Sequence, residues 1–290
     1  TIRPFFSRRI GLNVPIIGGI RMSGNLDEKW RLGVMDIQTQ KDQNLGLSSE
    51  NFGVFTLQRK VLDRSNISLI FVNKQQTETS EIDNSNNLFN RNLGLEYNYF
   101  SKDNLWNGKV LFLKSLSPTK EEQGNVYASH IGYQSTRWNW RIQQEYISDN
   151  YAAEVGYIPR KNYLKLQVKG GYLNYTKKET ILLSHGPGVS QTYFFDSKLD
   201  NKDQLISLKY LFNFKNRSQL SIGFQNQFIQ LLSNFDPLRT GIAFLDEGTS
   251  HKWNNFTISY NSKPQNRFTY SFETITGGYY SEGKRSAFMG

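Results

Sequence analysis

The residues best placed to do chemistry in this chain are basic side chains that recur on the polar side of alternating segments. These residues are Arg141, Lys165, Lys169 and Lys209. If the polar side lines a water-filled pore, such a set favours anionic solutes over cationic ones. The same side chains could instead pair with Glu96, Glu145 and Glu273 and only fill the interior. The sequence leaves both interpretations open.

Other residue types that commonly carry catalysis or bind metals do not cluster. The three histidines, His130, His185 and His251, lie far apart, without a carboxylate or second histidine at ligand spacing. The chain has no cysteine, so it has no disulfide and no thiolate metal site. Residues 200–203 lack the glycine and distal glutamate of a calcium loop and are interpreted as a turn. We therefore expect a protein that is not an enzyme and has no catalytic, cofactor or metal site.

The elements that position these residues show a side-chain period of two, which is typical of β-strands. In residues 204–214, for example, Ile206 and Phe214 share a side with other apolar residues, while Ser207 and Asn213 lie on the opposite side. We predict that the apolar sides face lipid and the basic residues above face a lumen. The predicted lipid-facing belt consists of Trp138, Trp140, Leu208, Tyr210, Phe212, Ile222 and Phe224.

The pattern predicts about fourteen strands along the chain. They span residues 15–24, 30–38, 51–61, 65–74, 92–99, 109–116, 126–134, 138–147, 164–172, 189–196, 204–214, 219–231, 253–260 and 267–275. Short turns roughly alternate with longer polar loops, which are predicted at residues 39–50, 76–90, 117–124, 148–162 and 233–251. Short turns on one side of a membrane and long loops outside it are typical of outer-membrane barrels. Residues 176–188 break the alternation and are expected to form an ordered loop at the rim.

Composition supports the same fold class. Apolar residues make up 37% of the chain and aromatic residues 14%, and the mean hydropathy is −0.58. No segment approaches the roughly 18 to 20 apolar residues that a membrane helix requires. The predicted fold is all-β: an antiparallel up-and-down transmembrane β-barrel, with residues 1–290 as one barrel domain. The net charge of +10 is spread over many strands, which suits a solvated surface or anionic lipid headgroups and argues against nucleic acid.

Several motifs resemble those of a known family. Residues 4–11 read Pro-Phe-Phe-Ser-Arg-Arg-Ile-Gly, and two glycine-containing strands follow at 15–24 and 30–39. Residues 156–160, Gly-Tyr-Ile-Pro-Arg, are similar to a mid-barrel Gly-Phe-x-x-Arg segment. The chain thus resembles an uncharacterised family of Bacteroidota envelope proteins. Their N-terminal part is similar to a carbohydrate-binding family 9 module, and their C-terminal part is an expected outer-membrane barrel.

The resemblance implies a fold and a location in the bacterial outer membrane, but no activity and no catalytic residues. The sugar-binding-like module is missing, and family members continue for several strands, so we expect a part of a longer chain. Residues 277–290 do not read as a closing strand, so the last strand is expected to pair with later residues or another chain. Expected partners are outer-membrane lipid and lipopolysaccharide, other envelope proteins, and glycans through the missing module.

The leading functional hypothesis is a non-enzymatic integral outer-membrane β-barrel, acting as a pore or as a barrel subunit of a larger envelope assembly. One alternative is a surface β-rich glycan-binding protein, in which Trp138, Trp140 and Trp253 stack on sugars. A weaker alternative is a barrel-embedded hydrolase with a carboxylate site in its lumen. Partitioning into detergent separates the first hypothesis from the glycan-binding one.

Overall fold

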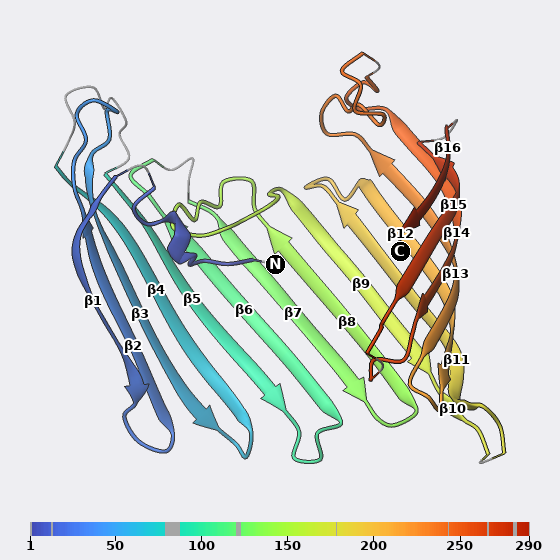
Figure 1. Cartoon of the computed structure of the whole chain (residues 1–290). Coiled ribbons are helices and arrows are strands. Elements are labelled where there is room, and N and C mark those ends of the chain that lie inside the picture. Colours follow the sequence, from blue (N-terminus) through green and yellow to red (C-terminus); the bar gives the residue numbers. More distant parts are fainter. Residues whose placement is uncertain are drawn as a thin grey trace. The chain divides into compact units, whose positions relative to one another are not determined.

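The computed structural model describes residues 2–12, 14–78, 88–119, 123–177, 179–242, 244–265, 267–280 and 283–289. These residues form an antiparallel all-β structure with one short 3-10 turn, η1 (Ser7–Arg9) (Figure 1). Within those ranges, no helix has the length and apolar character needed to cross a membrane. The strands are β1 (Ile16–Asn25), β2 (Trp30–Thr39), β3 (Ser49–Val61), β4 (Ser65–Glu78), β5 (Phe89–Phe100), β6 (Trp106–Leu116), β7 (Asn125–Gln134), β8 (Trp138–Ile147), β9 (Tyr163–Tyr172), β10 (Asn174–Tyr175), β11 (Leu182–Phe195), β12 (Asn201–Phe214), β13 (Gln219–Gln230), β14 (Ser250–Asn261), β15 (Ser271–Tyr279) and β16 (Gly283–Met289).

Each strand segment predicted from the alternation overlaps an observed strand, so the all-β prediction is confirmed. The structure adds the two-residue strand β10 and the strand β16, where the sequence suggested no closing strand. The strand predicted at residues 267–275 begins later, at Ser271. Parts of the predicted loops 76–90, 117–124 and 233–251 lie outside the described residues.

The loop predicted at residues 176–188 extends too far, because β11 already begins at Leu182. Gly186 and Pro187 suggested a loop, but both have a role in a strand here. A Cβ at position 186 would lie 1.9 Å from the carbonyl oxygen of Tyr172, so only glycine allows this close approach. Pro187 stands where the neighbour of β11 changes from β10, which ends its pairing at His185, to β9, whose pairing starts at Gly188. No residue of β9 or β10 pairs with position 187, so the missing N–H of proline costs no hydrogen bond on that side of β11.

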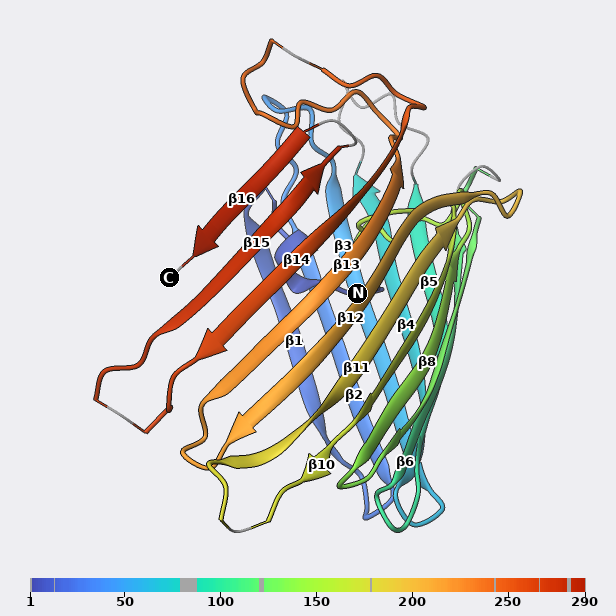
Figure 2. The ribbon, with the colours of Figure 1, turned by 90° about the vertical axis from the view of Figure 1, so that its right-hand side faces the viewer.

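The strand order follows the chain, which confirms the antiparallel up-and-down arrangement. Each strand is hydrogen-bonded to the next, except that β9 pairs with β11, and β10 pairs with β11 outside the main path. Figure 2 shows β11 to β16 side by side in this order. Closure into a barrel is not observed. Among the described residues, β1 pairs with β2 alone and β16 with β15 alone, so their other edges have no partner strand.

The chain divides into two compact units, which we describe separately. Unit 1 comprises Thr1–Ile131 and Glu145–Tyr163, and unit 2 comprises Gly132–Gln144 and Leu164–Gly290. In unit 1, Ile10, Phe52, Val72 and Val155 form a buried cluster, with partly buried residues such as Met35 packed around it. Because Phe52 and Val72 are strand residues, the core of unit 1 lies on one face of the sheet, beneath the N-terminal segment and residues 148–162.

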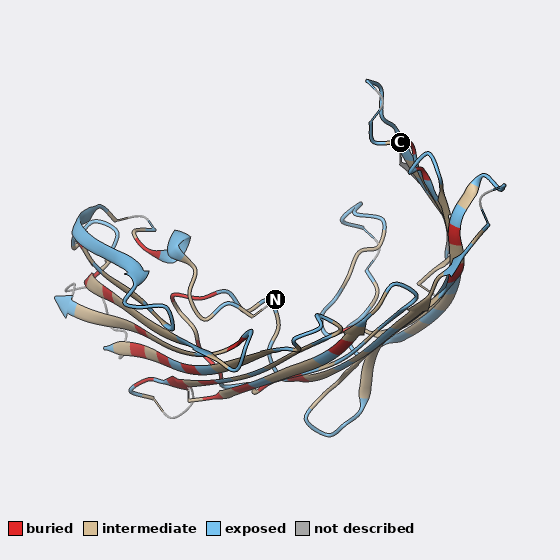
Figure 3. Cartoon of the chain, turned by 90° about the horizontal axis from the view of Figure 1, so that it is seen from below, coloured by how far each residue is buried: buried red, intermediate tan, exposed pale blue. Residues whose placement is uncertain are grey.

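In unit 2, the strand register separates the side chains into two faces. Leu208 pairs with Phe224, which pairs with Phe256, so all three lie on one face. Lys209 pairs with Gly223 on the opposite face, because neighbouring residues of a strand point to opposite sides. Figure 3 shows that buried residues form short stretches, while most strand residues are intermediate or exposed.

Candidate functional site

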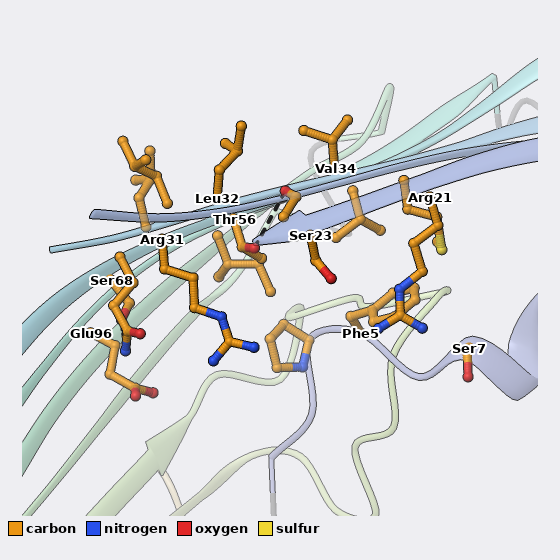
Figure 4. A pocket seen from close by; sticks show the side chains of 18 of the residues that line it. Phe5, Ser7, Arg21, Ser23, Arg31, Leu32, Val34, Thr56, Ser68 and Glu96 are labelled. Atoms are coloured by element: carbon orange, nitrogen blue, oxygen red, sulfur yellow. Dashed lines mark hydrogen bonds between the residues drawn. The ribbon is translucent and has the colours of Figure 1, made fainter. Parts of the chain in front are cut away.

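A groove on the polar face of unit 1 is the candidate site. It has a volume of about 720 Å³ and is lined by residues of β1 to β6 and of the N-terminal segment. Figure 4 shows Arg21, Ser23, Arg31 and Thr56 extending from the sheet into the space where Phe5 lies. A groove of this size can hold a small organic molecule.

The strand register explains why these side chains meet on one face. Ser23 pairs with Gly33, and Gly33 pairs with Thr56, so the three positions lie side by side across β1, β2 and β3. The intervening residues Leu32 and Val34 point to the other side of the sheet, as Figure 4 shows. Gly33 leaves room for the side chain of Thr56, because a Cβ at position 33 would lie 2.5 Å from the Thr56 hydroxyl oxygen.

The N-terminal segment is attached to residues 148–162 by backbone hydrogen bonds. The amide of Arg3 donates to the carbonyl of Tyr157 at 3.2 Å, and the amide of Tyr157 donates back at 2.8 Å. The amide of Phe6 donates to the carbonyl of Val155 at 2.7 Å. Gly156 permits this contact, since a Cβ there would lie 2.4 Å from the carbonyl oxygen of Arg3. Sequence and packing thus place Phe5 and Pro4 at the edge of the groove.

Residues 148–162 are fixed in turn to the polar face of the sheet. The side-chain amides of Asn90 and Asn92 donate to the carbonyl of Ala152 at 3.2 and 3.1 Å. Lys74 Nζ lies 2.7 Å from carboxylate oxygens of both Glu50 and Glu154. The prediction of a long outer loop at 148–162 therefore missed its main property, which is that it packs back onto the sheet.

Tyr151, in residues 148–162, is buried by this packing. Its side chain is fully buried, and its hydroxyl has no hydrogen-bond partner among the residues that the structure describes. Burial raises the pKa of this hydroxyl, because the ionised form would have to leave water. The polar face of unit 1 is therefore partly covered by the chain itself.

The charged residues that line the groove are Arg21, Arg31, Glu96 and Lys109. Lys109 Nζ lies 2.6 Å from Glu96 Oε2, and the side-chain amide of Asn98 donates to Glu96 Oε1 at 2.6 Å. Both carboxylate oxygens are thus bonded. Arg21 and Arg31 make no hydrogen bond or ion pair within the described residues, and both are exposed.

The groove therefore combines two guanidinium groups, an already paired carboxylate, hydroxyl and amide groups, and an apolar floor that includes Met35, Val54 and Ile70. Such a set binds through charge, hydrogen bonds and apolar contact. In the described part of the chain, no group of three or more His, Asp or Glu residues is arranged to hold a metal ion.

The structure places the four predicted basic residues in unit 2, on strands β8, β9 and β12. Lys169 pairs with Ser190, and Ser190 pairs with Ser207 two residues from Lys209, so Lys169 and Lys209 share a face. Lys165 is on the same strand face as Lys169 and lies 5.5 Å from the ring centroid of Phe194. Arg141 is on β8.

Two of the acidic residues that the sequence suggested as partners for these basic residues interact with other side chains instead. Glu96 pairs with Lys109 in unit 1, and Glu145 accepts a very short hydrogen bond from the hydroxyl of Tyr163. Glu273 lies on β15, opposite Met289 of β16 and Ser259 of β14.

The predicted apolar belt residues lie on β8, β12 and β13. Tyr210 pairs with Ile222 and Leu208 with Phe224, so these four share one face, and Phe212 lies on it as well. On β8, the Trp138 ring lies 4.7 Å from that of Tyr172, and the Trp140 ring lies 6.2 Å from that of Tyr133.

Sequence reasoning missed the groove. The available signal was the pair of arginines in the first predicted hairpin, each two residues before a small residue, Ser23 or Gly33. Their importance depends on which other cations are already paired and on what covers the sheet, and neither is visible in the sequence.

The fold defines a class of protein, an antiparallel all-β protein whose strands carry an apolar face and a polar face. Within this class, the chain belongs to the family described as Domain of unknown function (DUF5916), whose model matches residues 11–289. Neither a curated protein nor a solved structure matches the chain.

Proposed function

We propose that the chain is a non-enzymatic integral outer-membrane β-barrel domain, which acts as a pore or as a barrel subunit of a larger envelope assembly. The observation that carries the proposal is the exposed apolar face of the strands. Leu95, Val110, Trp138 and Phe256 are 53%, 56%, 56% and 61% exposed. In a soluble sheet, such a face packs against a second layer. In a membrane barrel, the same face contacts lipid.

The polar face supports the same proposal. Lys109 and Glu96 form an ion pair there, and the Gln167 amide donates to the hydroxyl of Thr192 at 2.7 Å. Side chains of this kind suit a water-filled lumen and are costly in lipid. The apolar and polar faces thus require two different surroundings, and a barrel wall supplies both.

Strand length and aromatic residues agree with a bilayer. Strand β6 has 11 residues and β12 has 14, whereas about 9 to 11 tilted residues span the hydrocarbon core. Tyr260 and Tyr270 flank a connection between strands with their rings 5.9 Å apart. Trp138 and Tyr172 lie close to other strand ends. Aromatic residues at strand ends are typical of the membrane interface.

The proposal requires partners for the free edges of β1 and β16, because each unsatisfied backbone group in lipid costs several kcal/mol. These partners would be further strands or another envelope protein. The other proposed partners are outer-membrane lipid and lipopolysaccharide, and glycans if a sugar-binding-like module precedes this domain. A Bacteroidota source and an absence of nucleic-acid binding are parts of the same proposal.

Detergent dependence tests this proposal directly. The chain is produced in a bacterial host with an export signal, and outer-membrane and soluble fractions are compared. We expect the folded protein in the membrane fraction, released only by detergent, with trypsin-resistant strands after reconstitution into liposomes. Ion conductance across a planar bilayer then separates a pore from a non-conducting barrel subunit. A folded chain that remains in buffer without detergent would overturn the proposal.

One observation favours the glycan-binding alternative. Trp253 and Tyr280 are stacked with ring centroids 4.9 Å apart, and Tyr279 and Phe235 lie beside Tyr280 at 4.7 and 5.0 Å. Aromatic groups of this kind can stack on sugar rings. Retention of the detergent-free protein on insoluble polysaccharide, lost in Trp253→Ala, would support this alternative.

A further inference from the structure

The charge balance of the groove in unit 1 is the starting point. The groove is lined by three cationic side chains and one carboxylate. Each oxygen of the Glu96 carboxylate already has a partner, since Oε2 is paired with Lys109 Nζ and Oε1 accepts from the side-chain amide of Asn98. Among the described residues, neither Glu96 nor any other carboxylate forms an ion pair with the guanidinium group of Arg21 or Arg31.

The other two arginines on the strands of unit 1, Arg59 and Arg91, have neighbours that occupy them. Arg59 lies over the ring of Trp30 at 5.1 Å, and the guanidinium of Arg91 donates to Asn73 and Gln75. A guanidinium forms its strongest contacts with carboxylate and phosphate groups, often through two hydrogen bonds at once. Because no described residue holds Arg21 or Arg31 in this way, their guanidinium groups can bind an acid group of a ligand.

The rest of the groove defines the other part of such a ligand. Met35, Val54 and Ile70 form an apolar floor, and Phe5 and Pro4 form an apolar edge. Arg21 and Arg31 lie on neighbouring strands, β1 and β2, and Figure 4 shows both side chains extending into the groove. An apolar body resting on this floor would leave its acid group at the arginines.

We infer that this groove is a binding site for small organic anions, which carry a phosphate or carboxylate group on an apolar body. The inference deepens the proposed function by naming a solute class, and it rests on that function only in requiring that water reaches the polar face. Arg21 and Arg31 hold the acid group, and the apolar floor holds the body.

Calorimetric titration of the full chain, folded in non-ionic detergent or in buffer if it is soluble there, tests the inference. The probes are phenyl phosphate, phenylacetate and the uncharged benzyl alcohol. We expect saturable binding of at least one of the two anions and at least tenfold weaker binding of benzyl alcohol. The arms with phosphate and carboxylate show which acid group the site prefers. Failure of both anions to bind saturably would overturn the inference.

Charge-removing variants locate the site. Arg21→Gln and Arg31→Gln should each weaken binding at least about tenfold, since each removes a charge-assisted hydrogen bond to the acid group. Arg59→Gln is the matched control, because it removes the same charge from the opposite face of the sheet. Equal weakening by the control, or unchanged binding in both groove variants, would contradict the inference. Membrane fractionation of the same variants should be unchanged, so a failure of the membrane proposal is seen separately.

Discussion

Replacing Leu208 with arginine separates a lipid-facing surface from a water-facing one. Leu208 lies at the middle of β12, and its neighbours across the sheet, Val189 and Phe224, are both apolar. If lipid surrounds this face, Leu208→Arg places a charge near the bilayer midplane. The free energy of unfolding should then fall by about 2–4 kcal/mol.

In water, the same substitution should be much milder. Leu208 is already 50% exposed, so at roughly 2 kcal/mol for full burial of a leucine, the lost contacts cost about 1 kcal/mol. The aliphatic part of the arginine restores some of these contacts. The loss of unfolding free energy caused by Leu208→Arg should therefore be at least about 1–3 kcal/mol larger in lipid than in water. Equilibrium unfolding measurements resolve a difference of this size.

Ser207→Arg is the control within the same strand. Ser207 points to the opposite face, where it pairs with Ser190 and Gln225. An arginine there meets a polar surface, and the expected change is within about 0.5 kcal/mol. Both variants are folded into liposomes across a urea series and followed by tryptophan fluorescence. If their unfolding free energies agree within about 1 kcal/mol, the assignment of the apolar face to lipid is wrong.

Three further predictions concern the loop connections and the covered part of unit 1. Gly156→Ala should speed proteolysis of the N-terminal segment, since its Cβ would lie 2.4 Å from that segment's backbone, whereas Gly24→Ala, with open space around it, should not. Tyr151→Phe should leave the thermal unfolding free energy unchanged or raise it by up to about 1 kcal/mol, because the buried hydroxyl has no partner in the described part of the chain; a loss above about 2 kcal/mol would contradict this. Hydrogen bonds from the Ser101 hydroxyl and a backbone amide lower the pKa of Asp103. The ionised carboxylate therefore stabilises the fold above its unfolded pKa, and this stabilisation is lost as the pH falls through its lower folded pKa. In an acid titration, the Asp103→Asn variant should lose less unfolding free energy below about pH 4 than the unmodified protein does.

The sequence alone determined the local structure of this protein. A period of two fixes which residues of one strand share a side, so the alternation placed Leu208 and Lys209 on opposite faces of their strand. The pairing of Leu208 with Phe224 depends on the register between strands and comes from the structure. Alternation is local because successive side chains in an extended chain point to opposite sides whatever surrounds them. The same reasoning failed at Gly186, where a close approach between strands required glycine inside a strand.

The tertiary structure decided which parts of the polar face are covered and which remain open. Asn90 binds Ala152 across more than sixty residues of sequence, and Lys74 is held by Glu50 and Glu154 from two different elements. Such contacts depend on the path of the loop after β8, which hydrophobic periodicity does not encode. The groove, in which no described residue pairs with Arg21 or Arg31, arises in the same way, because whether a charge is paired depends on residues brought close only by folding.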